Sequence, residues 1–239
     1  MNNLVFIHGA GMDRTIWQPL ISIVEDHDFN AHAVDLPGHG ESTDNALTTI
    51  EKLTTWLLGT LDNETTLIGH SMGTLIALEA AAQAPDKINK LILLGTGLPM
   101  SVNPTLLEAA RAKQSQVVET IVLYGHAWRG EPGIEPFADP AVVEEVRTRL
   151  TQSLENGTLY TDLNACNEYQ NGLSAAEQIR CPVRLILGQE DRMTPPANTK
   201  ELITRLQDVA VTTIPDCGHM ILWEQPDTAY AALLTALTS

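Results

Sequence analysis

The sequence has few basic residues and no long hydrophobic run. Its 239 residues include 14 lysines and arginines against 30 aspartates and glutamates, a formal net charge of −16. A surface this acidic repels the phosphate groups of nucleic acids and anionic membranes, so we expect neither as a partner. No run approaches the roughly 20 apolar residues of a membrane span. The first residues carry no basic cluster of a secretion signal. We therefore expect a cytoplasmic protein.

Cysteine is also scarce. The three cysteines Cys166, Cys181 and Cys217 are far apart, and none belongs to a C-x-x-C pair. An odd number without close spacing predicts reduced thiols rather than a disulfide framework or a zinc site. The glycine-rich stretch near residue 9 matches neither the G-x-G-x-x-G nor the G-K-S/T pattern of nucleotide-binding loops. The sequence thus predicts a protein with no metal and no cofactor.

What the chain does have is an alternation of short apolar runs and helical patterns. Hydrophobic residues make up 44% of it, enough to bury a sizeable core. We expect strands at residues 4–7, 31–35, 66–69, 90–94, 183–188 and 209–214. Helical patterns lie between them at 47–61, 72–84, 197–206 and 228–237. This alternation predicts an α/β fold with a mostly parallel sheet of about six strands, flanked by helices.

Residues 98–180 interrupt the alternation between the fourth and fifth expected strands. They show helical patterns at 104–123 and 140–154 and a break rich in glycine and proline at 130–136. We predict that 98–180 form a helical cap, inserted into a core domain made of 1–97 and 181–239. The alternative is an enlarged crossover connection that leaves the sheet unchanged.

The pattern Gly69-His70-Ser71-Met72-Gly73 marks a candidate nucleophile. It follows an expected strand and opens an expected helix, the setting of a G-x-S-x-G turn. The small flanking residues allow a sharp turn that presents the serine hydroxyl at a helix N-terminus, where developing negative charge is stabilised. The neighbouring His70 is expected to point to the other side of the turn. The alternative for Ser71 is a plain helix N-cap.

A serine needs a base to take its proton and an acid to orient that base. Among seven histidines, His219 is the best candidate for the base, because it follows the last expected strand and so lies at the same sheet edge as Ser71. Asp191 and Glu190 follow the fifth strand. We prefer Asp191, because its shorter side chain is held more rigidly before Thr194; its alternative is a capping role.

An oxyanion needs two preorganised N–H donors. The residue after the nucleophile, Met72, supplies one. The second is expected from the small-residue loop after the first strand, where backbone can approach a ligand closely. Ala10 is the preferred donor, with Gly11 or Met12 as alternatives.

The order Ser71, Asp191, His219 resembles that of the α/β-hydrolase superfamily. Further points of match extend over nearly the whole chain: His8-Gly9 with Trp17, residues 35–42 (DLPGHGES), 69–73, 188–191, and 218–220 with 224–226. The resemblance implies a Ser71–His219–Asp191 triad, an oxyanion hole of Ala10 and Met72, and a cap that walls the pocket. It also implies that the chain starts on the third of the usual eight strands. A serine nucleophile argues against the haloalkane dehalogenases and epoxide hydrolases of this superfamily, which have an aspartate there.

The expected activity is a serine carboxylesterase that forms an acyl-enzyme. The predicted cap has no cluster of arginine or lysine, which favours small to medium, mostly neutral esters. Candidate pocket residues are Gly11, Leu98, Tyr124, Trp128 and Met220. One alternative is an enol-lactonase or carbon–carbon bond hydrolase of ring-cleavage products, favoured by a basic residue facing the pocket. Another is a triad-bearing ligand sensor, favoured by slow turnover with ligand-dependent stabilisation. The oligomeric state stays open.

Overall fold

A computed structural model describes residues 3–27, 29–61, 64–127 and 139–239. Within these residues six strands form one sheet in the order β2-β1-β3-β4-β5-β6, and all paired strands are parallel. The strands are β1 (Asn3–Ile7), β2 (Asn30–Val34), β3 (Thr65–His70), β4 (Ile88–Leu94), β5 (Val183–Gly188) and β6 (Val209–Ile214). Each expected strand is present within two residues at either end. The prediction of a parallel α/β sheet of about six strands is confirmed.

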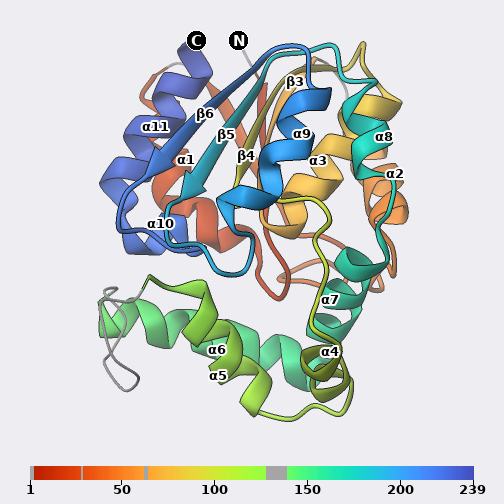
Figure 1. The fold of residues 1–239 in the computed structure, drawn as a ribbon, viewed down its shortest axis with the longest axis vertical. Coiled ribbons are helices and arrows are strands. Elements are labelled where there is room, and N and C mark those ends of the chain that lie inside the picture. Colours follow the sequence, from red (N-terminus) through yellow and green to blue (C-terminus); the bar gives the residue numbers. More distant parts are fainter. Residues whose placement is uncertain (1–2, 28, 62–63, 128–138) are drawn as a thin grey trace.

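Helices cover both faces of the sheet (Figure 1). One core cluster joins one face to α1 (Gln18–Glu25) and α11 (Pro226–Thr238). A second cluster joins the other face to α2 (Ile50–Thr60), α3 (Met72–Gln83), α8 (Gly172–Ala176) and α9 (Lys200–Arg205). The central strands therefore have no face exposed to solvent: all six residues of β3 are buried. This explains why the strands read as apolar runs rather than as alternating patterns.

Four helices lie beyond the carboxyl ends of the strands (Figure 1). They are α4 (Pro104–Arg111), α5 (Gln116–Gly125), α6 (Pro140–Asn156) and α7 (Thr158–Glu168), and we call them the helical layer. The helical pattern expected at 104–123 forms two helices, α4 and α5. The chain turns between α4 and α5, where Lys113 has a positive φ of 54° that a continuing helix does not allow.

Not all of residues 98–180 belong to the helical layer. Helix α8 packs against α3 and α9 beside the sheet, and Leu98 and Tyr169 belong to the core cluster of that face. The division of the chain into a core domain and a cap at 98 and 180 stays a prediction. Three shorter helices complete the described elements: η1 (Arg14–Trp17), η2 (Pro196–Thr199) and α10 (Ile221–Glu224). Among the described helices, none has the length and apolar character needed to cross a membrane.

Candidate active site

Ser71 lies in a strained turn between β3 and α3. Its backbone has φ 52° and ψ −121°, outside the regions that serine ordinarily adopts. Both flanking glycines are required sterically: a Cβ on Gly69 would lie 2.4 Å from the carbonyl oxygen of Gly73, and one on Gly73 would lie 2.3 Å from that of Ile7. The Ser71 side chain makes no capping hydrogen bond to the helix. The turn therefore presents the hydroxyl rather than using it to cap α3.

Asp191 and His219 form a buried pair at the same sheet edge. The Oδ2 atom of Asp191 lies 2.8 Å from Nδ1 of His219, and both side chains are almost fully buried. Asp191 Oδ1 accepts hydrogen bonds from the backbone N–H groups of Met193 and Thr194. Burial alone raises the pKa of Asp191, but His219 and the Thr194 donors outweigh it and lower the pKa to about 2. The carboxylate is thus held ionised against the imidazole.

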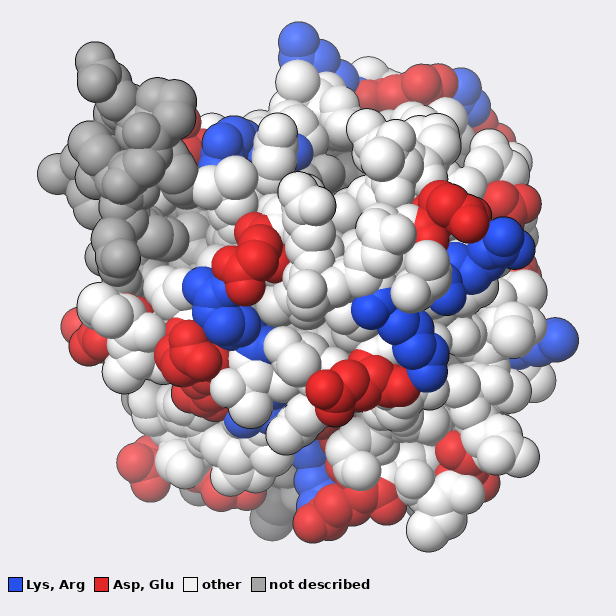
Figure 2. Space-filling model, turned by 90° about the horizontal axis from the view of Figure 1, so that it is seen from below, with Lys and Arg blue, Asp and Glu red and all other residues white. Residues whose placement is uncertain are grey.

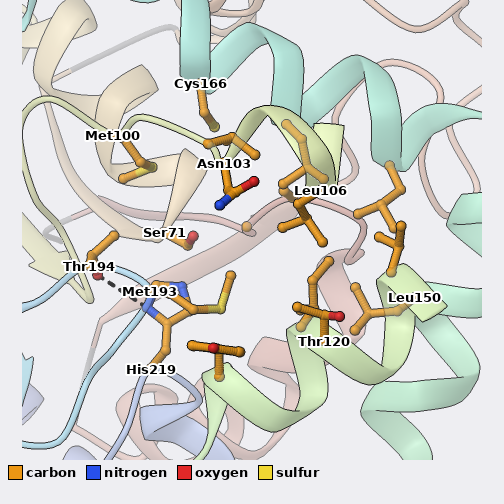
Figure 3. Close-up of a pocket in the computed structure, with 18 of the residues that line it drawn as sticks. Ser71, Met100, Asn103, Leu106, Thr120, Leu150, Cys166, Met193, Thr194 and His219 are labelled. Carbon is orange, nitrogen blue, oxygen red and sulfur yellow. Dashed lines mark hydrogen bonds between the residues drawn. The ribbon is translucent and has the colours of Figure 1, made fainter. Parts of the chain in front are cut away.

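Thr194 joins this pair. Its hydroxyl donates to Asp191 Oδ2 at 2.8 Å and lies 3.1 Å from His219 Nδ1 (Figure 3). With Nδ1 engaged on this side, Nε2 is the ring nitrogen left for proton transfer. Glu190, the alternative acid, is exposed to solvent. Of the two acids considered from the sequence, the structure brings Asp191 to His219.

The expectation for His70 is wrong, because its side chain turns toward the site. Its Nε2 donates to the carbonyl oxygen of His219 at 3.0 Å, and the two rings are 5.0 Å apart. Burial and the nearby His219 lower the pKa of His70 to about 3, so its ring is neutral. Within the described part of the chain its Nδ1 has no hydrogen-bond partner. His70 therefore supports the backbone of the loop that carries His219.

In the loop after β1, hydrogen bonds engage the N–H groups next to Ala10 in the chain. The Met12 N–H donates to the carbonyl oxygen of Gly9 at 3.2 Å, and the Gly11 N–H donates to Asp162 at 2.8 Å. The carbonyl oxygen of Gly9 also lies 2.9 Å from His8 Nδ1. Within a trans peptide the C=O and N–H groups point in opposite directions. The Ala10 N–H shares a peptide with the Gly9 carbonyl, so it points away from His8 and Met12. Ala10 lines the pocket, whereas the N–H groups of Gly11 and Met12 are engaged.

Met72 stands at the start of α3, directly after Ser71. The N–H groups of a helix's first turn have no intrahelical acceptor, and they point along the positive end of the helix dipole. The Met72 side chain is fully buried under the sheet edge, so its backbone is firmly placed. The two N–H groups expected from the sequence thus belong to the two segments that border Ser71.

A cavity of about 570 Å³ extends from Ser71 and His219 into the helical layer (Figure 3). Its walls within the layer are mainly aliphatic. They come from all four helices: Leu106, Val117, Ile121, Leu150, Leu159 and Leu163. Asn103 and Thr120 add neutral polar groups, and Arg192 is the one charged residue among the described residues that line it. Its guanidinium lies 4.9 Å from the ring of Tyr124 and donates to the carbonyl oxygen of Leu123.

The candidate pocket residues have different outcomes. Tyr124 and Met220 line the cavity. Gly11 does not, because Leu150 and Leu159 stand in front of it at the cavity wall. Leu98 does not either, because it packs over Gly172 beside the sheet. Trp128 lies outside the described residues.

Several lining residues had no signal in the sequence. Asn103, Leu150 and Met193 reach the cavity from three separate segments, and each looks like a capping, core or loop residue in its own segment. Only the packing of the helical layer on the sheet edge brings them together. Asp162 was also unforeseen; its carboxylate accepts a hydrogen bond from the Gly11 N–H in the loop after β1.

The outer face of the helical layer carries mixed charge (Figure 2). Its described arginines pair with carboxylates. Arg111 pairs with Glu108, Arg147 with Glu119 and Glu144, and Arg149 with Asp13 and Glu145. This face therefore offers no concentrated basic patch among the described residues.

Comparison with known proteins gives consistent results. The sequence pattern of the alpha/beta hydrolase family matches residues 4–233. A pimeloyl-(acyl-carrier protein) methyl ester esterase of Aromatoleum aromaticum is 27% identical over 238 residues, which cover 94% of each chain. The enol-lactonase from Burkholderia xenovorans has a TM-score of 0.84 at 23% identity, covering 100% of this chain and 92% of its own. An esterase from Exiguobacterium antarcticum has a TM-score of 0.87 at 15% identity, with the same coverage. At these identities the two solved structures show a shared fold.

Proposed function

Because the chain belongs to the alpha/beta hydrolase family, we propose that it is a serine hydrolase that cleaves carboxylic esters through an acyl-enzyme. The observation that carries this proposal is the buried Asp191–His219 pair beside Ser71, at the end of a largely aliphatic cavity. The curated relative is named as a methyl ester esterase, which supports the same reaction class. The reaction needs a nucleophile, a base and an oxyanion hole, and each has a candidate in the pocket.

In the acylation step His219 Nε2 takes the proton of the Ser71 hydroxyl as its oxygen attacks the ester carbonyl carbon. The tetrahedral intermediate places its negative charge on the former carbonyl oxygen. The N–H groups of Ala10 and Met72 stabilise that charge. Asp191 stays ionised and stabilises the imidazolium. The carbon–oxygen bond to the alcohol then breaks, and His219 returns its proton to the leaving alcohol.

Deacylation repeats these roles with water. His219 takes a proton from a water molecule, whose oxygen attacks the acyl carbon of the Ser71 ester. The second tetrahedral intermediate uses the same two N–H groups. Collapse releases the carboxylic acid and restores the Ser71 hydroxyl with the proton from His219. No cofactor takes part in this sequence of steps.

The cavity favours a small to medium, mostly neutral substrate. Its volume of about 570 Å³ suits a small-molecule ligand, and its aliphatic walls favour an apolar acyl or alcohol group. The relative's named substrate is a methyl ester of an acyl group linked to a carrier protein. A carrier-linked substrate also needs a docking face, and the described arginines of the helical layer are already paired with carboxylates. We therefore favour a free ester.

A second candidate reaction is hydrolysis of an enol-lactone or of a carbon–carbon bond in a ring-cleavage product. A basic residue facing the pocket favours this alternative, and Arg192 lines the cavity. Arg192 is exposed to solvent, and its guanidinium stacks on Tyr124, which also lines the cavity. No observation favours the ligand-sensor alternative.

A series of p-nitrophenyl esters from acetate to octanoate tests the leading proposal, with Ser71→Ala as the control. Turnover by the wild type that is lost in the variant is the expected result, and the best chain length reports the depth of the cavity. Turnover of lactones or vinylogous diketones instead, also lost in Ser71→Ala, would favour the second candidate. A folded wild type that hydrolyses none of these compounds would contradict both.

A further inference from the structure

Asp162 is a buried carboxylate that the reaction above does not use. It belongs to α7 in the helical layer, does not line the cavity, and is 1% exposed. Its Oδ2 atom accepts two hydrogen bonds at 2.8 Å, one from the Gly11 N–H and one from His39 Nε2. A buried carboxylate is costly unless it is paired in this way. Asp162 thus connects the helical layer to the loops after β1 and β2.

His39 carries a positive charge in this arrangement. Its Nε2 faces the Asp162 carboxylate, and its Nδ1 lies 3.2 Å from the carbonyl oxygen of Pro37. Both partners accept hydrogen bonds, so both ring nitrogens must carry protons. Burial lowers the pKa of His39, but the charge and hydrogen bond of Asp162 outweigh burial and leave the pKa raised above its ordinary value. The His39–Asp162 contact is therefore a buried ion pair.

His8 has the opposite state, although its ring lies only 4.9 Å from that of His39. The Leu36 N–H donates to His8 Nε2 at 3.1 Å, so that nitrogen carries no proton. The other nitrogen, Nδ1, donates to the carbonyl oxygen of Gly9. Burial, together with the charge on His39, lowers the pKa of His8 to about 4. A neutral His8 and a charged His39 thus hold neighbouring parts of the loops at the sheet edge.

These contacts determine the direction of the Ala10 N–H. The peptide before Ala10 is held through the Gly9 carbonyl, which accepts from His8 and Met12. The peptide after Ala10 is held through the Gly11 N–H, which Asp162 accepts. We propose that Asp162 is a positioning residue that aims the Ala10 N–H at the oxyanion, through Gly11 and the protonated His39. This inference rests on the proposed function, because it assigns Asp162 a part in the same oxyanion hole.

The chain offers a matched control for the general docking of the helical layer. Arg149 of α6 forms an ion pair at 2.6 Å with Asp13, which also follows β1. That contact joins the same layer to the same loop region. It ends on the Asp13 side chain, beyond the two peptides that flank Ala10. A variant of Arg149 therefore weakens docking without releasing the Gly11 N–H.

The first experiment compares Asp162→Asn with Arg149→Gln, using the best p-nitrophenyl ester. Loss of an entire oxyanion donor lowers kcat about 10²–10³-fold, so misdirection of one donor in Asp162→Asn is expected to lower it about tenfold or more. KM should change less than about twofold in both variants, because neither change alters ground-state binding. Arg149→Gln should keep kcat within about twofold, because it leaves the Gly11 N–H bound to Asp162. Equal losses in the two variants, or an unchanged kcat in Asp162→Asn, would overturn the proposal.

A second measurement does not depend on turnover. Nitrogen-15 NMR of the wild-type histidine side chains, with His39 assigned by its absence in His39→Gln, should show that His39 loses its proton at a pH above 6.5, the ordinary pKa of an imidazole. A His39 that titrates at or below 6.5 would overturn the proposal. If the wild type hydrolyses no ester, the proposed function fails. The rate of Ser71 labelling by a fluorophosphonate then replaces kcat in comparing Asp162→Asn with Arg149→Gln.

Discussion

The two sides of the cavity are held by different forces. On the sheet side, Ser71, Asp191 and His219 stand in a strained turn and a network of short hydrogen bonds. On the side of the helical layer, the walls are aliphatic side chains held by packing. Hydrogen bonds fix atoms in direction as well as in distance, whereas packing tolerates changes of shape. We propose that the sheet side sets the reaction and that the helical layer sets the size of the substrate.

The largest effect is expected from Asp191→Asn on the sheet side. Asparagine keeps the shape but loses the charge, so the imidazolium is no longer stabilised and the His219 tautomer is no longer fixed. We expect kcat to fall about a thousandfold or more, with a small change in KM. Steady-state kinetics on the best ester measures this. Glu190→Gln, a change at the exposed neighbouring acid, is the control and should keep kcat within about twofold. Similar losses in both variants would mean that Asp191 has no special role.

Leu150→Ala tests the layer side. Leu150 lines the cavity, while Leu154 lies one turn along α6, equally buried and away from the cavity. Truncation of either should lower the free energy of unfolding by about 2–5 kcal/mol. Only Leu150→Ala should shift the preferred acyl chain toward longer esters, because only this change enlarges the cavity. Urea unfolding and the ester series measure the two effects. If Leu154→Ala also shifted the preferred acyl chain length, the position of Leu150 at the cavity wall would not explain the shift.

Thr194→Val gives a smaller effect on the sheet side. The valine keeps the volume but removes the hydroxyl that donates to Asp191 and lies beside His219 Nδ1. We expect kcat to fall about tenfold, which corresponds to one hydrogen bond to a charged group. Thr194→Ser restores the hydroxyl and should recover most of the activity. If serine fails to rescue while the protein stays folded, the methyl group and not the hydroxyl matters at this position.

The smallest expected effects concern stability against pH, and they have opposite signs on the two sides. His8 belongs to the sheet side and is neutral in the folded state, with a pKa of about 4 against an ordinary value of 6.5. As the pH falls, His8 therefore binds a proton in the unfolded chain at a higher pH than in the folded protein. The contribution of His8 to stability is lost between about pH 6.5 and 4. His39 is held by the layer with a raised pKa, so its contribution is complete below pH 6.5 and is lost as the pH rises through the raised value.

Urea unfolding from about pH 5.5 to 8.5 should show both losses of stability, the acid loss from His8 being on the order of 1 kcal/mol over this range. His39→Gln should remove the alkaline loss and leave the acid loss. His8→Gln should leave the alkaline loss and reduce the acid loss without abolishing it, because the buried neutral His70 contributes to the acid loss as well. An alkaline slope that persists in His39→Gln would show that another group causes it.

The same contrast explains what could be predicted from the sequence. The six strands are apolar runs of characteristic length, and α11 (Pro226–Thr238) covers the helical pattern expected at 228–237. The triad candidates follow directly from strand ends, because the carboxyl ends of parallel strands meet at one edge. Ser71, Asp191 and His219 were therefore accessible from the order of local motifs alone. The direction of the His70 side chain was not, because a short motif does not show which way each of its members turns.

The helical layer was less predictable. Its apolar residues indicate that the helices are packed, but not which surface each of them packs against. Leu98 was therefore predicted to line the cavity, and instead it packs beside the sheet. The break at Lys113 was missed because the polar stretch at residues 111–116 contains no glycine or proline to mark the end of a helix. Asp162 stands 151 residues from Gly11, and nothing local to α7 marks it as a partner of the loop after β1. Such contacts depend on tertiary packing.

The most direct test of the account is to trap the acyl-enzyme. The wild type is mixed with the best p-nitrophenyl ester, quenched in acid within the first turnover and digested for mass spectrometry. We expect the mass of the acyl group on the peptide that contains Ser71, with one equivalent of p-nitrophenol released in the burst. A burst with the acyl group on another residue, or turnover that persists in Ser71→Ala, would contradict the central claim.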